Sequence, residues 1–286
     1  KKNNYDTVVS FCWSAIQYSR LCCLFLPSRH IACERGHDYN KFNVINIISR
    51  ILEPISDQII FNSKIQMFKY QKKFQIKNVP IQTIHNGINI DDFQNKKRIL
   101  IHRDLNLRPD TKLIGTVGNF TSVKNFNMFI EVCEKITQSY DDIHFLAIGD
   151  GQNRGKYESI VRSKNLENKL TFLGYRKNMN EIFPCLDIFL LTSNREGMPN
   201  VVMEAMVCRV PVITTNIDGS KELIDDEING YLVEKNDVSM MVKIIEKIIN
   251  NPQTKSTITK YAFEKISKNF TVEKMVEKYE DLFLQI

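Results

Sequence analysis

Short apolar runs alternate with amphipathic segments along the chain, and the alternation is sharpest between residues 187 and 214. The run DIFLL (187–191) is short enough to be a buried parallel strand, and a second such run follows at 210–214. Between them, VVMEAM (201–206) carries apolar residues at helical spacing, and Pro199 supplies the fixed φ that suits the start of a helix. The pattern therefore predicts a strand, a loop, a helix and a second strand.

The same alternation fills the rest of the chain, which predicts an α/β fold with parallel sheets. Breaks near Pro252 and at 269–270 divide the C-terminal part into helices, the last of which is expected at 271–284. Further strands are expected at 7–11, 30–33, 57–61, 79–84, 112–117, 144–148 and 170–173. Further helices are expected at 13–26, 44–52 and 64–74, and two more follow the strands at 112–117 and 144–148 and end near residues 140 and 164.

Two glutamates flank the start of the helix that is predicted after residue 199. Glu196 falls in the strand-to-helix loop, and Glu204 lies about one turn into the helix. A helix N-terminus attracts anions through its unpaired amides and its dipole, and carboxylates beside it can accept hydrogen bonds from sugar or ribose hydroxyls. For an isolated pair of glutamates the better explanation is the dipole alone, which favours acidic residues in a first turn.

Length and composition fit an α/β protein of two domains. A chain of 286 residues with 43% hydrophobic residues can bury two cores of ordinary size. The seven cysteines are odd in number, show no CxxC spacing and lie mostly in apolar segments, so we interpret them as reduced core residues. No apolar run approaches the roughly 20 residues that span a bilayer, and no signal peptide is visible.

The net charge of +6 is unevenly distributed. Residues 1–98 hold 15 Lys and Arg against 7 Asp and Glu, a net of +8, whereas the remainder holds 24 against 26, a net of −2. A basic N-terminal part is typical of proteins that meet an anionic acceptor, a membrane surface or nucleic acid, although a solvated basic surface explains it equally well. Because the sequence shows neither a helix-turn-helix pattern nor an aromatic and basic platform, no nucleic-acid partner is expected.

The motif EGMPNVVMEAM (196–206), in which seven residues separate two glutamates, resembles the signature of glycosyltransferase family 4, the group 1 glycosyltransferases of GT-B fold. The resemblance covers nearly the whole chain from about Asp6. Five further segments match in the order expected of the family: IHNGINIDDF near residue 90, GTVGNFTSVKN near 120, FLAIGDG near 150, LTFLGY near 172 and INGYLV near 230.

The resemblance implies two Rossmann-like domains that face each other across a cleft. They are expected at residues 1–94, for the acceptor side, and 95–270, for the nucleotide-sugar, with a helix over 271–286 that returns to the first domain. The chain has no initiator methionine and opens almost directly into a strand, whereas relatives carry further strands before that point. The N-terminal domain is therefore expected to be partial and the chain to be N-terminally incomplete.

The family's activity is transfer of a sugar from a nucleotide-diphosphate donor to an acceptor hydroxyl on a glycan, a lipid-linked glycan or a small molecule. The resemblance implies a retaining, metal-independent reaction in which the nucleotide-sugar is a co-substrate and no other cofactor is needed; the sequence contains no Asp-x-Asp. Alternatives are a decayed, non-catalytic nucleotide-sugar-binding module and another GT-B enzyme such as a nucleotide-sugar epimerase. A cytoplasmic location is expected, with peripheral contact to an anionic inner membrane face as one option.

The resemblance also assigns roles to residues of the second domain. Glu196 would hold the hydroxyls of the donor sugar and Glu204 the ribose, while Lys124 and the loop after Gly118 would face the diphosphate. As catalytic residues we expect Glu196 and Lys124. The helix start that would join Lys124 in stabilising the departing diphosphate consists of Gly197, Met198, Pro199, Asn200 and Val201.

The chain departs from the family pattern in several places. Asn119 stands where relatives usually carry a second diphosphate-binding arginine, and Arg35 replaces a histidine. Arg35 could bind a phosphate or carboxylate through bidentate hydrogen bonds, or could simply be a solvated side chain. Arg209 replaces a glycine at a helix end that needs a left-handed residue, at a cost of about 1 kcal/mol. Tyr175 and Arg176 lie where relatives contact the nucleobase, and could equally be surface residues.

Overall fold

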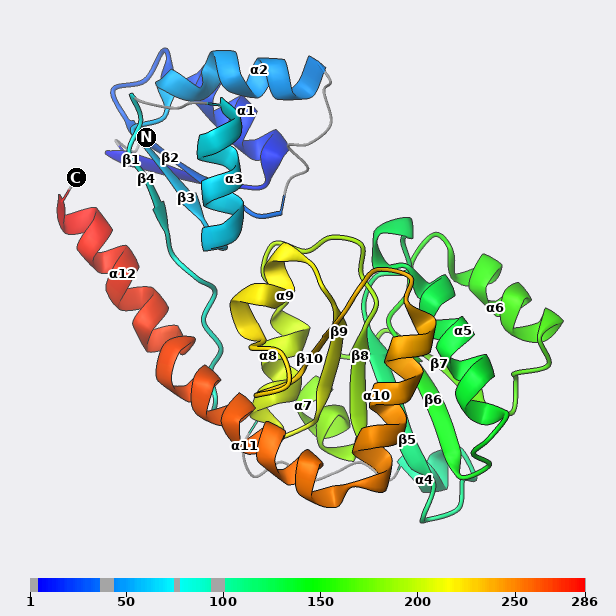
Figure 1. The fold of residues 1–286 in the computed structure, drawn as a ribbon. Helices are drawn as coiled ribbons and strands as arrows, with labels where there is room; N and C mark the ends of the chain where they lie inside the picture. The colour runs from blue at the N-terminus through cyan, green and yellow to red at the C-terminus, as the bar shows by residue number, and fades with distance from the viewer. Residues whose placement is uncertain (1–4, 37–43, 75–77, 94–100, 286) are drawn as a thin grey trace. The chain divides into compact units, whose positions relative to one another are not determined.

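The computed structural model describes residues 5–36, 44–74, 78–93 and 101–285, which form two compact α/β units (Figure 1). The first unit comprises residues 1–86, 196–198 and 273–286, and the second comprises residues 87–195 and 199–272. The domain boundaries predicted from the sequence, after residues 94 and 270, remain predictions.

The first unit is built on a four-stranded parallel sheet with the strand order β1-β2-β3-β4. Parallel neighbours joined by right-handed crossovers place every connecting helix on the same face of the sheet. The core agrees, since Ile16 of α1 and Met67 of α3 both pack against the Ala32 side of the sheet. The elements are β1 (Thr7–Phe11), α1 (Trp13–Cys23), β2 (Arg29–Glu34), α2 (Val44–Leu52), η1 (Glu53–Ile55), β3 (Gln58–Phe61), α3 (Lys64–Phe74) and β4 (Ile81–Thr83).

The last helix, α12 (Val272–Gln285), covers the opposite face of the first sheet. Side chains alternate along a strand, so Ile31 and Cys33 point away from the face that Ala32 occupies. Both residues cluster with Leu282 of α12, and Tyr279 packs against the same cluster. The C-terminal end of the chain thereby contributes to the core of the first unit.

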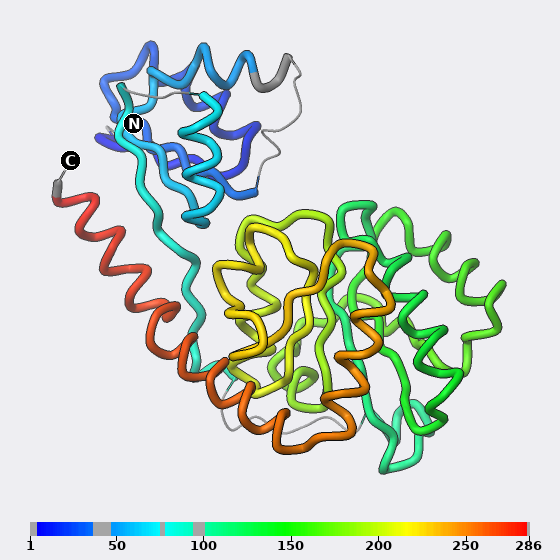
Figure 2. Tube along the Cα trace, in the orientation of Figure 1, coloured from blue at the N-terminus to red at the C-terminus, as the bar shows by residue number. Residues whose placement is uncertain are grey.

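The second unit is built on a six-stranded parallel sheet with the order β10-β9-β8-β5-β6-β7 (Figures 1 and 2). From β5 the chain steps outward through β6 to β7, then returns to the other side of β5 and steps outward again through β8, β9 and β10. The strands are β5 (Lys112–Val117), β6 (Ile143–Ile148), β7 (Leu170–Gly174), β8 (Ile188–Leu191), β9 (Val212–Thr215) and β10 (Tyr231–Val233).

Helices cover both faces of the second sheet. On one face, Phe129, Tyr157 and Met241 of α5, α6 and α10 share a core cluster with strand residues such as Phe145. On the other face, α8 lies against β8 and against α11. The helices are α4 (Ile101–Asp104), η2 (Ser122–Lys124), α5 (Phe126–Thr137), α6 (Arg154–Ser163), α7 (Met179–Ile182), η3 (Phe183–Cys185), α8 (Asn200–Val207), α9 (Asp218–Leu223), α10 (Val238–Asn250) and α11 (Pro252–Asn269).

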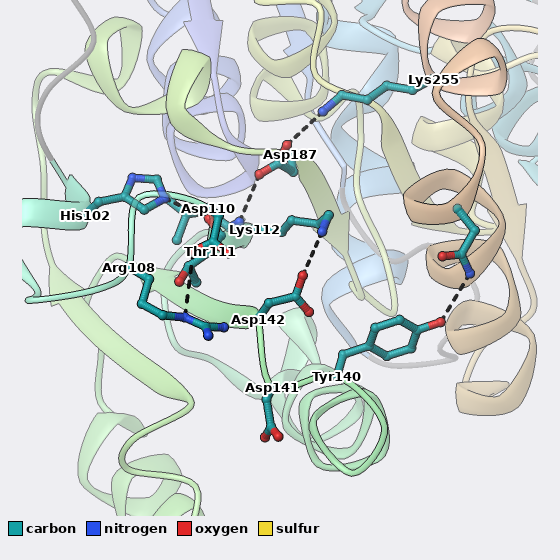
Figure 3. A network of polar contacts seen from close by, with 12 residues as sticks. His102, Arg108, Asp110, Thr111, Lys112, Tyr140, Asp141, Asp142, Asp187 and Lys255 are labelled. Carbon is teal, nitrogen blue, oxygen red and sulfur yellow. Dashed lines mark hydrogen bonds and ion pairs between the residues drawn. The ribbon is translucent and has the colours of Figure 1, made fainter.

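The amino ends of the second sheet are joined by paired charges (Figure 3). Lys112 Nζ at the start of β5 lies 2.8 Å from Asp142 Oδ2, just before β6, and this hydrogen bond lowers the pKa of the Asp142 carboxyl. Asp187 accepts hydrogen bonds from the Leu113 amide (3.1 Å) and from Lys255 Nζ of α11 (2.9 Å). These carboxylates serve to tie β5, β6, β8 and α11 together.

Most of the predicted elements are confirmed, and the differences have local causes. The strands at 7–11 and 112–117 and the helix at 64–74 have the predicted bounds. Helix α1 ends at Cys23 rather than at Leu26, because Pro27 disfavours the helical conformation in the residue before it. Among the described residues, no helix is long and apolar enough to cross a membrane.

The prediction that most cysteines are core residues is wrong in part. All seven lie in the described part of the chain, and none forms a disulfide. Cys33 and Cys133 are buried, but Cys12 and Cys22 are exposed and the other three are half-buried. Cys22 belongs to an apolar segment whose outer side faces solvent, so hydrophobic neighbours in the sequence did not imply burial.

The expected left-handed residue at the end of α8 is confirmed. Arg209 has a φ of 55° and follows the helix directly. Its guanidinium carbon lies 4.3 Å from the centre of the Phe263 ring on α11, which is the geometry of a cation–π contact. The contact offsets part of the strain that a non-glycine residue incurs in this conformation.

We therefore expect Arg209→Ala to destabilise the protein by about 1 kcal/mol, because it loses the ring contact and keeps the positive φ. Arg209→Gly should be nearly neutral, because it loses the same contact but also relieves about 1 kcal/mol of backbone strain. Urea unfolding of both variants measures the difference. Equal stabilities for alanine and glycine would show that no strain is stored at this position.

Candidate functional site

The strand order of the second sheet reverses between β5 and β8. β5 pairs with β6 on one side and with β8 on the other, and the chain leaves β5 and β8 toward opposite edges of the sheet (Figure 2). In open parallel sheets, ligands bind at the carboxyl ends of the strands at such a reversal, because the two departing connections leave a crevice there. The segments that flank this point are 118–125, after β5, and 192–199, after β8.

The segment after β5 is folded tightly against the turn after β6. The Phe120 amide donates to the Asp150 carbonyl oxygen at 2.8 Å, and the Asn153 amide donates to the Phe120 carbonyl oxygen at 3.1 Å. A Cβ on Gly149 would lie 2.0 Å from the Gly118 carbonyl oxygen, so only glycine fits there. The glycines that follow β6 therefore shape this segment, a role that the sequence did not reveal.

Lys124 and Gly118, both predicted site residues, are in contact. A Cβ on Gly118 would lie 3.2 Å from Lys124 Cε, so the lysine side chain crosses the glycine at close range. Asn119 is exposed at the same turn, with its Oδ1 close to Gly151. The structure thus brings Gly118, Asn119 and Lys124 together at the carboxyl end of β5.

Hydrogen bonds join the segment after β5 to the segment after β8. The Asn194 amide donates to the Val123 carbonyl oxygen at 2.8 Å, and Thr192 Oγ1 donates to the Lys124 carbonyl oxygen at 3.1 Å. On the other side, Thr215 Oγ1 at the end of β9 donates to the Ser193 carbonyl oxygen. The sequence analysis did not predict a role for Thr192, Asn194 or Thr215. Polar residues that follow parallel strands could have indicated them, because ligand sites form at the carboxyl ends of such strands.

Residues 196–198 group with the first unit. The Glu196 carbonyl oxygen accepts a hydrogen bond from Gln66 Nε2 at 2.8 Å, and its side chain is half-buried. A Cβ on Gly197 would lie 3.0 Å from the amide nitrogen of Gly36, which leaves little room for any side chain at this position. Met198 is buried. The backbone around the predicted catalytic glutamate is therefore fixed by the hydrogen bond from Gln66 and by the close contact with Gly36.

Helix α8 begins one residue later than predicted, since Pro199 precedes its first residue, Asn200. Proline has no side-chain oxygen that could cap the first amides of the helix. Pro199 is buried, Asn200 is exposed and Val201 is half-buried. The start of α8 thus presents backbone amides next to exposed polar atoms, an arrangement that favours anions.

Glu204 lies in the middle of α8 and is half-buried. Burial raises the pKa of its carboxyl to about 7. Within the described part of the chain, the carboxylate has no hydrogen-bond or ion-pair partner, and one turn further on the same burial raises the pKa of the Cys208 thiol to about 12. The fold therefore holds a desolvated carboxyl that a ligand hydroxyl could satisfy.

Tyr175 and Arg176 follow the edge strand β7. The Gly149 amide donates to the Gly174 carbonyl oxygen at 2.9 Å, which links this segment to the turn that packs on Gly118. Tyr175 is 70% exposed, and Arg176 lines a cavity of about 310 Å³ together with residues of α4 and α7. No described contact joins either side chain to Lys124 or Glu204.

Arg35 belongs to the first unit, directly after β2. Its guanidinium carbon lies 4.7 Å from the centre of the Phe11 ring at the end of β1, and the side chain is exposed. The same guanidinium donates a hydrogen bond to the Tyr279 hydroxyl of α12, so part of its donor set is already engaged. In the described residues of both units, no group of three or more His, Cys, Asp or Glu side chains is placed to hold a metal ion.

A reversed strand order, with glycine-rich segments at the carboxyl edge and a desolvated carboxyl in the helix after β8, defines the second unit as an open α/β sheet of the nucleotide-binding type. Residues 97–265, more than half of the chain, match the model of the family "Glycosyl transferases group 1". The chain belongs to the group 1 glycosyltransferases, enzymes that transfer sugars, and its two parallel sheets make up the GT-B fold.

Individual relatives agree with this assignment. An uncharacterized glycosyltransferase of Haemophilus influenzae is 23% identical over 285 residues, which cover 99% of this chain and 77% of that protein. An Escherichia coli UDP-Gal:alpha-D-GlcNAc-diphosphoundecaprenol alpha-1,3-galactosyltransferase is 28% identical over 221 residues, 75% of this chain and 57% of that protein. The chain therefore spans little more than half of the E. coli relative.

Among solved structures, Anabaena Alr3699/HepE in complex with UDP superposes with a TM-score of 0.88 at 18% identity. The match covers 99% of this chain and 79% of that chain. At this identity the likeness establishes the fold alone.

The raised pKa of Glu204 predicts a pH-dependent cost of folding. The unfolded chain ionises this carboxyl near its ordinary pKa of 4.5, whereas the folded protein does so near 7. The folded state therefore loses stability relative to the unfolded state as pH rises from about 4.5 to 7. Glu204→Gln should be more stable than the unmodified protein by on the order of 2 kcal/mol at pH 8, with no gain at pH 4.

Urea unfolding at the two pH values tests this expectation. Glu167→Gln, at an exposed position, is the matched control and should change stability at neither pH. A gain of the same size at both pH values would mean that the carboxyl of Glu204 is not desolvated.

Proposed function

We propose that this chain transfers a sugar from a UDP-sugar to an acceptor hydroxyl with retention of configuration, and that it binds the donor at the β5/β8 strand reversal. Two observations carry the proposal: a lysine folded over a glycine at the carboxyl end of β5, and a half-buried carboxyl without a described partner in the helix that follows β8. UDP is favoured as the nucleotide because the E. coli relative uses UDP-Gal and the Anabaena structure contains UDP.

The diphosphate would lie over Gly118, which leaves room for close approach to the backbone. Lys124 supplies a positive charge there, and the amides of residues 197–201 supply hydrogen-bond donors at the start of α8. Asn119 would donate a hydrogen bond in place of the arginine that relatives carry, but adds no charge. These groups favour the departing diphosphate, whose negative charge grows as the sugar leaves.

Glu204 would accept hydrogen bonds from the ribose hydroxyls. A carboxyl with a pKa of about 7 is largely ionised at slightly alkaline pH, so it can act as an acceptor. Binding a hydroxyl would return part of the solvation that the carboxylate lost on folding. Tyr175 and Arg176, next to the turn after β6, would contact the nucleobase.

Glu196 would hold the hydroxyls of the donor sugar. In a retaining transfer without a covalent enzyme intermediate, the bond between the sugar carbon and the diphosphate oxygen breaks as the acceptor oxygen forms its bond on the same face. The proton of the acceptor hydroxyl would pass to the departing phosphate oxygen, so no side chain has to act as general base. Glu196 and Lys124 are then the catalytic residues.

The acceptor would bind through the first unit, where Arg35 is suited to a phosphate or carboxylate group. A lipid-linked glycan has such a diphosphate, and the name of the E. coli relative gives its acceptor as a diphosphoundecaprenol-linked sugar. We infer that the protein works at the inner face of the membrane in peripheral contact with it. The basic charge of residues 1–98 supports an anionic acceptor surface.

We expect Glu204→Ala to weaken UDP binding by roughly 10- to 100-fold, because a hydrogen bond to a charged group contributes about 1.5–3 kcal/mol. Lys124→Ala should reduce turnover by about 100-fold. Glu196→Ala should lower turnover more than affinity, since its contact tightens as the sugar leaves. Isothermal titration with UDP and a donor screen read by product mass give these values.

Exposed residues of the same type provide the controls for these variants. Glu167→Ala and Lys156→Ala remove the same charges at the surface of the second unit and should leave UDP affinity and turnover unchanged. Unaltered kinetics in Glu196→Ala, Glu204→Ala and Lys124→Ala would refute the site. A folded protein that binds neither UDP nor GDP would instead favour a non-catalytic module.

Asn119→Arg should tighten UDP binding and make it more sensitive to salt, because it adds a charge where the diphosphate would lie. Asn168→Arg, an exposed position elsewhere in the second unit, adds the same charge and should change neither quantity. Titrations at low and high salt measure both effects. If the two variants behave alike, the phosphates do not lie on the segment after β5.

A further inference from the structure

Large apolar side chains lie exposed on the outer side of the helical layer that covers the first sheet. Phe25, in the turn after α1, is 87% exposed, and Tyr18 of α1 is 72% exposed. We name as the outer helical face the side of this layer that carries Tyr18, Leu21, Phe25, Ile48, Ile51 and Phe68. Single exposed apolar residues are ordinary, but several on adjoining helices mark a surface that something covers.

The geometry of the helices makes this face a separate surface from the core. On α1, Ile16 and Arg20 point into the first unit and are buried, whereas Tyr18 and Leu21 project from the opposite side. On α3, Met67 is buried and Phe68 is exposed. All three helices lie on the same side of the sheet, so their outer sides adjoin.

The described charged side chains of the three helices under this face are all positive. Helices α1, α2 and α3 contain no Asp or Glu. Their exposed charged residues are Arg50, Lys64, Lys69, Lys72 and Lys73. In the part of the chain that the structure describes, the exposed acids nearest in the sequence are Asp6 and Asp57, in the loops before β1 and β3. Asp57 lies close enough to Cys23, at the end of α1, to help raise the pKa of that thiol.

Basic and apolar groups are mixed on this face rather than separated. Lys64 Nζ lies 5.8 Å from the centre of the Phe68 ring, and Lys72 follows Phe68 by one helical turn. Arg50 is likewise adjacent to Ile51 on α2. Aromatic and aliphatic side chains surrounded by Lys and Arg are the composition of surfaces that lie in the interface of an anionic membrane.

We propose that the outer helical face docks on an anionic lipid surface, with Phe25 and its neighbours inserted among the lipids and the cations at the headgroups. A second copy of this chain is a poor alternative occupant. In a twofold dimer the same face meets itself, and Arg50 and the four lysines would then oppose like charges. The proposal rests on the proposed function only in that a lipid-linked acceptor would bring the enzyme to a membrane.

The test uses the full chain and sedimentation with vesicles that contain no acceptor and no nucleotide. Binding should rise when phosphatidylglycerol is added to phosphatidylcholine vesicles, and should fall at high salt. Phe25→Ser should lower the partition coefficient about tenfold, because one large apolar side chain no longer inserts. Phe68→Ser on α3 is a second variant in case the first does not fold.

Charge-reversal variants and a matched control separate the electrostatic contribution to vesicle binding from the contribution of the inserted apolar side chains. The double variant Arg50→Glu with Lys72→Glu should lose about tenfold or more of the binding to phosphatidylglycerol vesicles and most of its salt dependence. Tyr261→Ser, an exposed aromatic position on α11 of the second unit, should change nothing. UDP titration of the same samples without vesicles checks the donor site separately, and should give one affinity for all these variants.

Two results would overturn the proposal. One is vesicle binding that is absent, or that is equal for the unmodified protein, Phe25→Ser and Phe68→Ser. The other is a concentration-dependent dimer in sedimentation velocity that Phe25→Ser abolishes, which would make the face an interface between copies. Loss of UDP binding with vesicle binding intact would refute the proposed function and leave the docking surface standing.

Discussion

The reversal of strand order between β5 and β8 is the constraint on which the second unit depends. Because β5 pairs with β6 and β8, the chain leaves both strands at the same sheet edge and in opposite directions. The two connecting segments must then pack against each other, as the bonds from Thr192 and Asn194 to the segment after β5 record. The segment after β5 also packs against the turn after β6, and this second contact is why glycine is required at residue 149. Within the segment after β5, Lys124 lies across Gly118.

The acidic side chains of the second unit differ in whether they have a charged partner. At the amino ends of the second sheet, Asp142 and Asp187 are paired with lysines and join elements together. In α8, the helix that follows the carboxyl end of β8, Glu204 is desolvated and no described side chain satisfies its carboxylate. Paired charges contribute to the fold, whereas a desolvated carboxylate without a partner lowers its stability.

The helices of the first unit carry core residues and exposed apolar residues close together in the sequence. Ile16 and Met67 build the core, while Tyr18 and Phe68, one or two residues away, lie in solvent. Right-handed crossovers place α1, α2 and α3 on one face of the sheet, so their outward residues form one surface instead of three. A basic apolar face of this kind would bring an enzyme close to lipid-linked substrates.

The sequence by itself determined the α/β class, most strand and helix positions, the left-handed Arg209 and the family, because periodicity and turn chemistry are local. It also identified Glu196, Glu204 and Lys124 as candidates through motif resemblance. Only the tertiary structure decided which residues meet: the contact of Lys124 with Gly118, the roles of Thr192 and Thr215, the desolvation of Glu204 and the exposure of Cys22. Burial and contact depend on strand order and helix direction, which bring together residues that are far apart in the chain.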